Sequence, residues 1–316
     1  MDNLTHSLIG AALGQAGLKR KTGLAMPALI IAANLPDIDA ACFFWLDGTE
    51  HLGFRRGITH GPIAMALLPL LLAGALWAYD RWQTQRGTRP AERLPVHFGW
   101  LFALSLIGCL SHPLFDWFNN YGVRFLEPFS STWFYGDVLF IIDVWIIAML
   151  GGGLWLSRKQ ERAGSISWQR PARTALLLMT AYIGLNLGIS RMASALPAYS
   201  GMSAKVANPV PVAFWRREVL WRRSGQLSNP REPESYGSYT YSLFGGAKPS
   251  VVKAGDTNMA DPRIAEWAKG DPQAEAFLFW SRMPVAQPGP RGILLTDQRF
   301  MDSPARSNFT VELKPR

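Results

Sequence analysis

The chain contains little cysteine and little histidine. Among its 316 residues there are two cysteines, Cys42 and Cys109, and five histidines. Both cysteines fall within apolar stretches, so they lack the spacing of a disulfide framework or of a zinc site built on thiolates. We interpret them as small apolar side chains.

Several common catalytic motifs are also missing. The sequence has no HExxH motif of zinc proteases, no GxSxG motif of serine hydrolases, no GxxxxGK[ST] phosphate loop and no GxGxxG dinucleotide fingerprint. The net charge is +9, but no nucleic-acid-reading motif accompanies it, and Lys and Arg lie mainly beside apolar segments. These absences argue against those enzyme classes and against nucleic acid as a partner.

Long apolar segments dominate the first two thirds of the chain. Five of them approach the roughly 20 apolar residues that a helix needs to cross a bilayer, and they cover residues 24–46, 61–79, 97–117, 137–156 and 172–190. A shorter segment, residues 4–18, predicts a short N-terminal helix. We therefore predict a mainly α, polytopic membrane helical bundle with about five spans in residues 1–192.

The remaining residues, 193–316, are rich in Pro, Gly, Arg and Ser. Aromatic and β-branched stretches separated by Pro and Gly are typical of short strands, and we predict strands at 212–221, 236–243, 275–283, 291–300 and 308–313. This part is thus expected to form a small β-rich domain outside the membrane.

Basic residues indicate the orientation of the bundle. The loops at residues 19–21, 81–93 and 158–173 are basic, whereas those at 47–60 and 118–136 hold only three arginines. By the positive-inside rule the basic loops are cytoplasmic. The C-terminal domain is then expected on the outer side of the membrane.

In this topology, acidic and imidazole side chains gather at the outer membrane face. They are Asp37, Asp39, His60, His112, Asp116, Asp137 and Asp143, and His6 joins them if the first helix runs inward from that face. An Asp in the middle of a span costs about 2.5 to 3.5 kcal/mol, and such residues usually mark a functional path. A divalent metal would compensate the carboxylates, and the imidazoles favour Zn²⁺, or Mn²⁺, over Ca²⁺.

The spacing of His112 and Asp116 places both on one helical face, where they can bind a single ion. The residue before a proline is pushed from helical dihedrals, so we expect a new turn to begin at Pro113. The alternative is that His112 only caps a helix and that Asp116 lies near it by chance.

Pro36 is expected to kink or break the first full span within the sequence NLPDID. Of the two acids beside it, Asp39 is predicted as a metal ligand and Asp37 as a general base, unless the segment is a simple turn with capping carboxylates. His60 is predicted as a ligand, with an interfacial position as the alternative.

Two further groups complete the expected site. Asp137 and Asp143 begin the fourth predicted span; Asp143 is predicted as a ligand, and Asp137 either as a base or as a helix cap. Arg55 and Arg56 are predicted to bind a substrate phosphate, because guanidinium groups bind phosphate bidentately.

The segments MDNLTHSLIG, NLPDID, RGITHG, HPLFDWFNNYGVRFLEPFS and WFYGDVLFIID occur in that order. Together they resemble the YdjM-like family of bacterial inner-membrane, metal-dependent hydrolases, once described as LexA-binding hydrolases. The resemblance covers residues 1 to about 150.

The order of ligand types is more distantly similar to the zinc-dependent phospholipase C and single-strand nuclease superfamily. The matching residues are His6, Asp39, His60, His112 and Asp116. The resemblance implies one or two bound metal ions, because the later histidine ligands of that superfamily have no counterpart here.

We therefore expect a membrane-bound hydrolase in which a metal activates water and Asp37 or Asp137 accepts its proton. A site level with the lipid headgroups suggests a phosphoester or other ester of a lipid or lipid-linked substrate. The rival interpretation is a noncatalytic membrane protein that binds or transports an ion. A transporter favours polar residues that continue toward the cytoplasmic face, and here they stop at one face.

Overall fold

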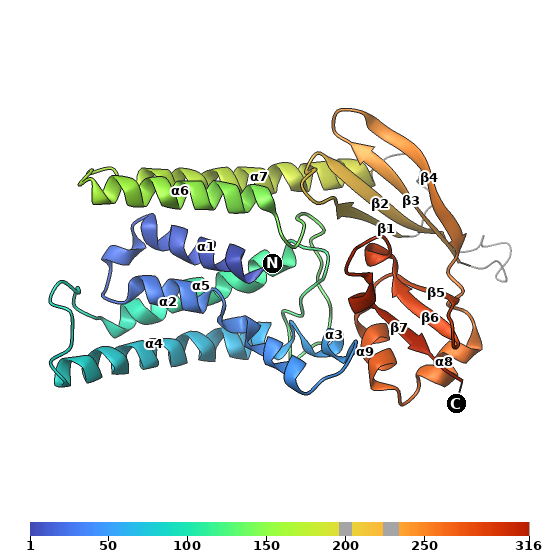
Figure 1. Cartoon of the computed structure of the whole chain (residues 1–316), viewed down its shortest axis with the longest axis horizontal. Coiled ribbons are helices and arrows are strands. Elements are labelled where there is room, and N and C mark those ends of the chain that lie inside the picture. The colour runs from blue at the N-terminus through green and yellow to red at the C-terminus, as the bar shows by residue number, and fades with distance from the viewer. Residues whose placement is uncertain (196–203, 224–233, 316) are drawn as a thin grey trace. The chain divides into compact units, whose positions relative to one another are not determined.

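The structure, a computed structural model, describes residues 1–195, 204–223 and 234–315. The chain divides into two compact units (Figure 1). The first consists of Met1–Ile38 and Arg56–Leu185, and the second of Asp39–Arg55 and Asn186–Arg316. The second unit thus includes a segment from within the predicted membrane domain, and the predicted boundary after residue 192 stays a prediction.

Helices build the first unit. They are α1 (Asn3–Gln15), α2 (Ala25–Ala32), α4 (Pro62–Gln85), α5 (Phe98–Trp117), α6 (Val144–Arg162) and α7 (Arg170–Ser194), the last of which continues into the second unit. Helix α1 packs on α2 and α6, and α5 packs on α2 and α4 (Figure 1). One apolar cluster joins Ile9 of α1 to Ile146 and Leu150 of α6, and another joins Leu29 of α2 to Leu104 of α5.

Two glycines let α1 and α5 approach α2 closely. A Cβ atom at Gly10 would lie 2.6 Å from the carbonyl oxygen of Leu29, and one at Gly108 would lie 2.6 Å from the Cβ atom of Ala32. His6 precedes Gly10 by four residues, and His112 follows Gly108 by four. Because residues four apart share a helix face, the glycine contacts also turn both histidines toward the end of α2.

Three helices, α4, α5 and α7, are long and apolar enough to cross a membrane. A fourth candidate is α2 together with the 3-10 stretch Leu35–Phe44, which is bent from it by 49°. The bend confirms the predicted break at Pro36. The described residues thus contain three or four candidate spans, and the predicted count of five stays a prediction.

The fourth predicted span, residues 137–156, was placed too early in the sequence. Helix α6 begins at Val144, because the Asp143 side chain accepts hydrogen bonds from the backbone N–H groups of Trp145 and Ile146. Residues before it form a loop on the end of α5, where the backbone N–H groups of Val138 and Leu139 donate to the carbonyl of Phe118 at 2.8 and 2.9 Å.

The second unit contains two antiparallel sheets. One has the order β1 (Ala204–Pro209), β2 (Arg216–Arg223), β3 (Ser235–Ser242) and β4 (Gly246–Asp256), and the other has β5 (Pro284–Pro288), β6 (Ile293–Asp297) and β7 (Thr310–Leu313). The predicted strands at 212–221, 236–243, 291–300 and 308–313 overlap β2, β3, β6 and β7. Small antiparallel sheets are therefore confirmed for this part of the chain.

The predicted strand at 275–283 is wrong. These residues belong mainly to helix α9 (Pro272–Trp280), which follows the short helix α8 (Pro262–Ala268). Asp271 caps α9 and Pro272 occupies its first turn, a combination that favours helix initiation. Helix α3 (Glu50–Phe54) packs on α9, and the Thr49 hydroxyl just before it donates to the Gln273 carbonyl at 2.9 Å.

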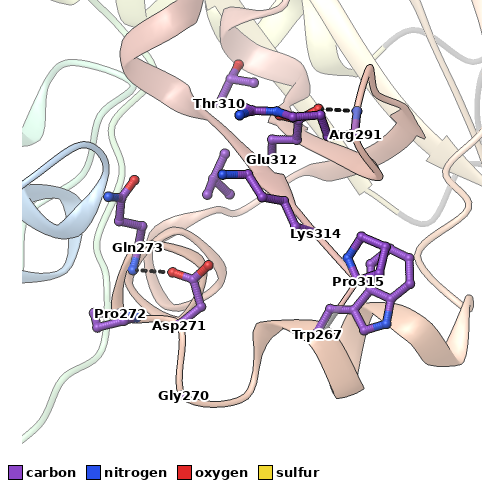
Figure 2. A pocket seen from close by; sticks show the side chains of 11 residues that line it. Trp267, Gly270, Asp271, Pro272, Gln273, Arg291, Thr310, Glu312, Lys314 and Pro315 are labelled. Atoms are coloured by element: carbon purple, nitrogen blue, oxygen red, sulfur yellow. Dashed lines mark hydrogen bonds and ion pairs between the residues drawn. The ribbon is translucent and has the colours of Figure 1, made fainter.

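A cavity of about 550 Å³ lies on the second unit beside the turn between α8 and α9. Figure 2 shows Trp267, Gln273 and Lys314 around it. Its carboxylates are engaged, because Asp271 caps α9 and Glu312 accepts a 2.9 Å hydrogen bond from Arg291. No histidine lines it.

Candidate metal centre

Four side chains that the sequence singled out converge in the first unit. Asp37, His60, His112 and Asp116 each offer one ligand atom, and these atoms all lie within 4.8 Å of one another. They come from the 3-10 stretch after α2, from the 3-10 turn before α4 and from the last two turns of α5. Asp37 is half-buried and the other three are buried. We call these four residues the quartet.

The distances within the quartet fit a shared ion better than direct hydrogen bonds. Asp116 Oδ2 lies 3.4 Å from His60 Nε2 and 3.5 Å from His112 Nε2, and His112 Nε2 lies 3.7 Å from Asp37 Oδ1. These separations are longer than ordinary N–H···O hydrogen bonds. With ligand bonds of about 2.1 Å, a tetrahedral zinc site separates neighbouring ligand atoms by about 3.4 Å.

The orientation of His112 is set by the end of α2. Its Nδ1–H donates to the carbonyl oxygen of Ala33, the C-cap residue of α2, at 2.7 Å. That carbonyl has no partner within the helix, and the bond fixes the tautomer in which Nε2 carries a lone pair. Nε2 is buried and has no hydrogen-bond partner among the described residues. His60 is similarly held, with Nδ1 2.9 Å from the Thr59 hydroxyl.

His6 lies beside the quartet and is not one of the four. Its ring stacks on His112 with 3.9 Å between the centroids, and its Nε2 lies 3.3 Å from Asp116 Oδ1. The ring is fully buried, and Nδ1 has no hydrogen-bond partner within the described residues. The structure therefore brings His6 to the predicted place, while its role as a ligand stays a prediction.

Two positive groups accompany Asp116. The Arg56 guanidinium lies against both carboxylate oxygens, with Nε 3.0 Å from Oδ2 and Nη2 3.1 Å from Oδ1. The amino group of Met1 also forms an ion pair with Asp116. Arg56, predicted to bind substrate, is thus directed at a predicted ligand of the metal.

Asp39, predicted as a ligand, and Arg55, predicted to bind substrate, form their own pair in the second unit. Arg55 Nε lies 3.4 Å from Asp39 Oδ1, and the guanidinium also lies over the Phe43 ring. Within the described residues Asp39 is not part of the quartet, whereas Asp37, two residues earlier, is. The structure thus places in the quartet the acid that was predicted as a base.

The carboxylate of Asp143, also predicted as a ligand, is engaged elsewhere. It caps α6 and accepts a 3.0 Å hydrogen bond from the Tyr182 hydroxyl. Asp143 is outside the quartet in the described structure. The apolar sequence around it is explained by burial of a helix cap, not by proximity to the other acids.

Asp137 lies in a loop that touches the end of α5. A Cβ atom at Gly136 would lie only 2.5 Å from the carbonyl oxygen of Trp117, the residue after Asp116. Asp137 itself has φ 55°, a left-handed conformation that Asp adopts more readily than most residues. The loop brings the residue before Asp137 against the end of α5, and the role of Asp137 as a base stays a prediction.

The prediction of site residues missed Asn119 and Tyr121. Asn119 Oδ1 accepts hydrogen bonds from Arg56 Nη1 at 3.0 Å and from the Tyr121 backbone N–H at 2.8 Å. The Tyr121 ring lies under the Arg56 guanidinium, 4.6 Å from the centroid to Cζ. An adjacent Asn pair after an apolar span was the available signal, because such amides need partners when they are buried.

Comparison with known proteins decides the family. The sequence model of the YdjM inner membrane protein family matches residues 1–193. The chain belongs to this family. The resemblance inferred from the five motifs is thereby confirmed, and the YdjM match together with the apolar helices identifies a membrane protein.

The YdjM match includes all four residues of the quartet, as well as His6, Arg56 and Asn119, and ends within α7. No curated protein and no solved structure matches the chain. The more distant similarity to the zinc-dependent phospholipase C and nuclease superfamily therefore stays a prediction.

Proposed function

We propose that this member of the YdjM family is a membrane-bound, metal-dependent hydrolase that cleaves a phosphoester of a lipid or lipid-linked substrate. The quartet carries the proposal, because two imidazoles and two carboxylates are brought together in a buried place with separations suited to one ion. Two carboxylates in such a place are costly unless they are compensated. A divalent cation would add to the compensation that Arg56 and Met1 give Asp116, and would use the lone pair of His112 Nε2.

The donor set favours zinc. Imidazole and carboxylate together suit Zn²⁺, with Mn²⁺ as the next choice, whereas Ca²⁺ takes oxygen ligands. A bound divalent cation of this kind lowers the pKa of a water molecule toward about 7 and stabilises negative charge on the attacked group. Asp37, His60, His112 and Asp116 would hold it.

The protein's own groups have separate tasks in this proposal. With Asp37 in the quartet, Asp137 is the acid left to accept the proton of the attacking water. His6, stacked on His112, closes one side of the site against water. The nearby Arg56 keeps the loaded site positive, since a divalent cation and one guanidinium outweigh the two carboxylates of the quartet. A positive site attracts an anionic substrate such as a phosphoester.

The lipid character of the substrate rests on position. The basic loops predict that the quartet lies at the outer end of the spans, at the level of the lipid headgroups. An active site there is reached more easily by a headgroup phosphoester than by a solute of the cytoplasm. The part of the chain that follows α7 is proposed to be periplasmic for the same reason.

Metal content tests the proposal first. Detergent-purified wild-type protein is compared by elemental analysis with His112→Ala and Asp116→Asn, and with His51→Ala as a matched control. His51 lies in α3 with Nδ1 2.7 Å from the Gly48 carbonyl oxygen and is outside the quartet. We expect near-stoichiometric zinc or manganese in the wild type and in His51→Ala, and its loss in the other two variants.

Turnover tests the hydrolase assignment separately. The metal-loaded protein is offered bis(p-nitrophenyl) phosphate, p-nitrophenyl phosphate and vesicles of a phospholipid, with Asp137→Asn as the variant that keeps metal and loses rate. Hydrolysis that requires the metal supports the proposal. Bound metal with no turnover of any ester would favour the noncatalytic, ion-binding alternative.

A further inference from the structure

Arg56 is a buried, charged side chain beside the quartet that contacts several protein groups. It is 4% exposed, and its backbone has φ 55°, a left-handed conformation that costs energy for a residue other than glycine. The surrounding structure must therefore maintain this conformation. Such a strained, buried arginine next to a candidate metal site needs an explanation.

The Arg56 guanidinium is directed at protein groups on every edge. Nη2 donates to Asp116 Oδ1 at 3.1 Å, and Nε lies within ion-pair distance of Oδ2, at 3.0 Å. Nη1 donates to Asn119 Oδ1 at 3.0 Å and to the Gly122 carbonyl at 3.3 Å. Tyr121 covers one face of the guanidinium. These contacts leave the group poorly placed to reach a substrate phosphate.

The second partner of Arg56 is itself fixed. Asn119 Oδ1 also accepts the Tyr121 backbone N–H, and the backbone N–H of Arg124 donates to the Arg56 carbonyl at 2.9 Å. The segment that follows α5 therefore forms hydrogen bonds with both the side chain and the backbone of Arg56. Because Asp116 lies in the last turn of α5, the guanidinium connects the acid to the segment that follows it.

We infer that Arg56 is a positioning residue for the metal: it clamps the Asp116 carboxylate so that Oδ2 faces the Nε2 atoms of His60 and His112. The inference rests on the metal site of the proposed function and replaces the expectation that Arg56 binds substrate. A carboxylate can rotate about its Cβ–Cγ bond, and the hydrogen bond from Nη2 to Oδ1, with the charge of Nε beside Oδ2, restricts that rotation. Removing such outer partners of metal ligands typically weakens metal binding 10- to 100-fold.

The clamp requires the fork of an arginine. A lysine keeps the charge but presents a single ammonium without the planar pair of donors. It can neutralise Asp116, yet it cannot fix the plane of the carboxylate. The inference thus predicts that metal affinity decreases in the order wild type, Arg56→Lys, Arg56→Gln. A purely electrostatic role would not separate Arg56→Lys from the wild type, because lysine keeps the charge.

Zinc affinity of the detergent-purified full chain, measured by competition with a chromogenic chelator, tests the inference. We expect Arg56→Gln to bind zinc about 10- to 100-fold more weakly than the wild type, with Arg56→Lys in between. Arg55→Gln is the matched control, because the neighbouring arginine pairs with Asp39, outside the quartet. It should bind zinc like the wild type. Thermal unfolding in chelator reports whether each variant is folded.

Chemical rescue separates positioning from a general structural role. Arg56→Gly suits the left-handed backbone and leaves space where the guanidinium stood, over Tyr121. Added guanidinium ions should restore about a tenth or more of the wild-type zinc affinity to Arg56→Gly. They should not change the zinc affinity of Arg55→Gln, in which no such space is created beside Asp116. A merely structural loss would not be repaired by a small ion, so rescue decides the matter even if Arg56→Gln does not fold.

The outcomes distinguish the two proposals. If the wild type binds no metal, the proposed function fails and the inference falls with it. If the wild type binds zinc and Arg56→Gln and Arg56→Gly bind it equally well, only the inference is overturned. Unchanged zinc affinity with a weakened inhibition by inorganic phosphate would return Arg56 to the role of a substrate-binding residue.

Discussion

Two buried aspartates, one in each unit, each pair with an arginine through the same two nitrogens, yet their surroundings differ. In the second unit, Arg299 Nε and Nη2 lie 2.8 and 2.9 Å from the two oxygens of Asp297. In the first unit, Arg56 approaches Asp116 with the same two nitrogens at 3.0 and 3.1 Å. The arginine clamp alone therefore does not distinguish a structural acid from a functional one.

The difference lies in what else surrounds the carboxylate. Asp297 accepts further hydrogen bonds from the Ser281 hydroxyl at 2.6 Å and from the Met283 backbone at 3.1 Å, so protein donors satisfy it. Asp116 is instead surrounded by the Nε2 atoms of three histidines at 3.3 to 3.5 Å. The Ala33 carbonyl fixes the His112 tautomer, so His112 Nε2 presents a lone pair to Asp116 and cannot donate to it. A cation shared by that lone pair and Asp116 Oδ2 would serve both groups, and this is the physical basis of the metal proposal.

The largest effect is expected when the same substitution is made in both places. Asp116→Asn and Asp297→Asn each leave a buried arginine without its counter-charge, which costs about 3 to 5 kcal/mol of stability. Only Asp116→Asn should also lose the bound metal. Thermal unfolding in chelator and elemental analysis measure the two quantities. Equal metal content in the two variants would contradict the distinction.

The next effect concerns how the helices bring the quartet together. Gly108→Ala adds a methyl group that would lie 2.6 Å from Ala32 Cβ and 2.9 Å from the Leu29 carbonyl, so α5 must move from α2. We expect zinc affinity to fall about 10-fold, as for other changes around metal ligands. Gly99→Ala in the same helix meets no atom within 4 Å and should leave the affinity unchanged. Chelator competition compares them, and equal affinities would show that the close contact does not position His112.

Part of this site could be predicted from sequence because helical periodicity fixes it. His112 and Asp116 are four apart on α5, so their common face follows from spacing. The choice between Asp37 and Asp39 could not be made in this way. In the 3-10 stretch that contains both, residues two apart point in directions about 120° apart around the helix axis. One must face away from the quartet, and which one depends on the bend after α2.

Other features depend on contacts that no local pattern contains. The hydrogen bond between Arg56 and Asn119 joins residues 63 positions apart. Helix α9, in contrast, was recognisable: Asp271 followed by Pro272 is a helix start, but the aromatic residues after it favoured a strand. Phe277 and Trp280 are buried in the second unit, so their aromatic character reflects core packing and not strand formation.

A moderate effect should appear in the pH dependence of the second unit. Burial alone raises the pKa of Asp297, but the Arg299 guanidinium and the Ser281 hydroxyl outweigh it and hold the pKa at about 2. An unfolded Asp has a pKa near 3.9, so the ionised pair stabilises the folded unit by about 2.5 kcal/mol above that pH. Because the folded pKa is the lower one, this stabilisation is lost as the pH falls from about 4 to 2.

Denaturant unfolding of the wild type and of Asp297→Asn at pH 7, 5 and 3 measures this contribution. The asparagine cannot titrate, so the difference in free energy of unfolding between the two proteins should be constant from pH 7 to 5 and smaller at pH 3. A difference that stays the same at pH 3 would mean that the Asp297 pKa is not lowered in the folded state.

The smallest effect on stability is expected at Asp143, where substitution tells whether this residue is a helix cap or a metal ligand. Asp143 accepts two backbone N–H groups at the start of α6 and the Tyr182 hydroxyl. Asp143→Ala should therefore lower stability by about 1 kcal/mol, the usual cost of a lost cap. Metal content should stay at the wild-type level, whereas loss of metal would make Asp143 a ligand. Asp143→Ser, which restores a capping oxygen with no carboxylate, should recover most of the stability, because capping needs an acceptor and not a charge.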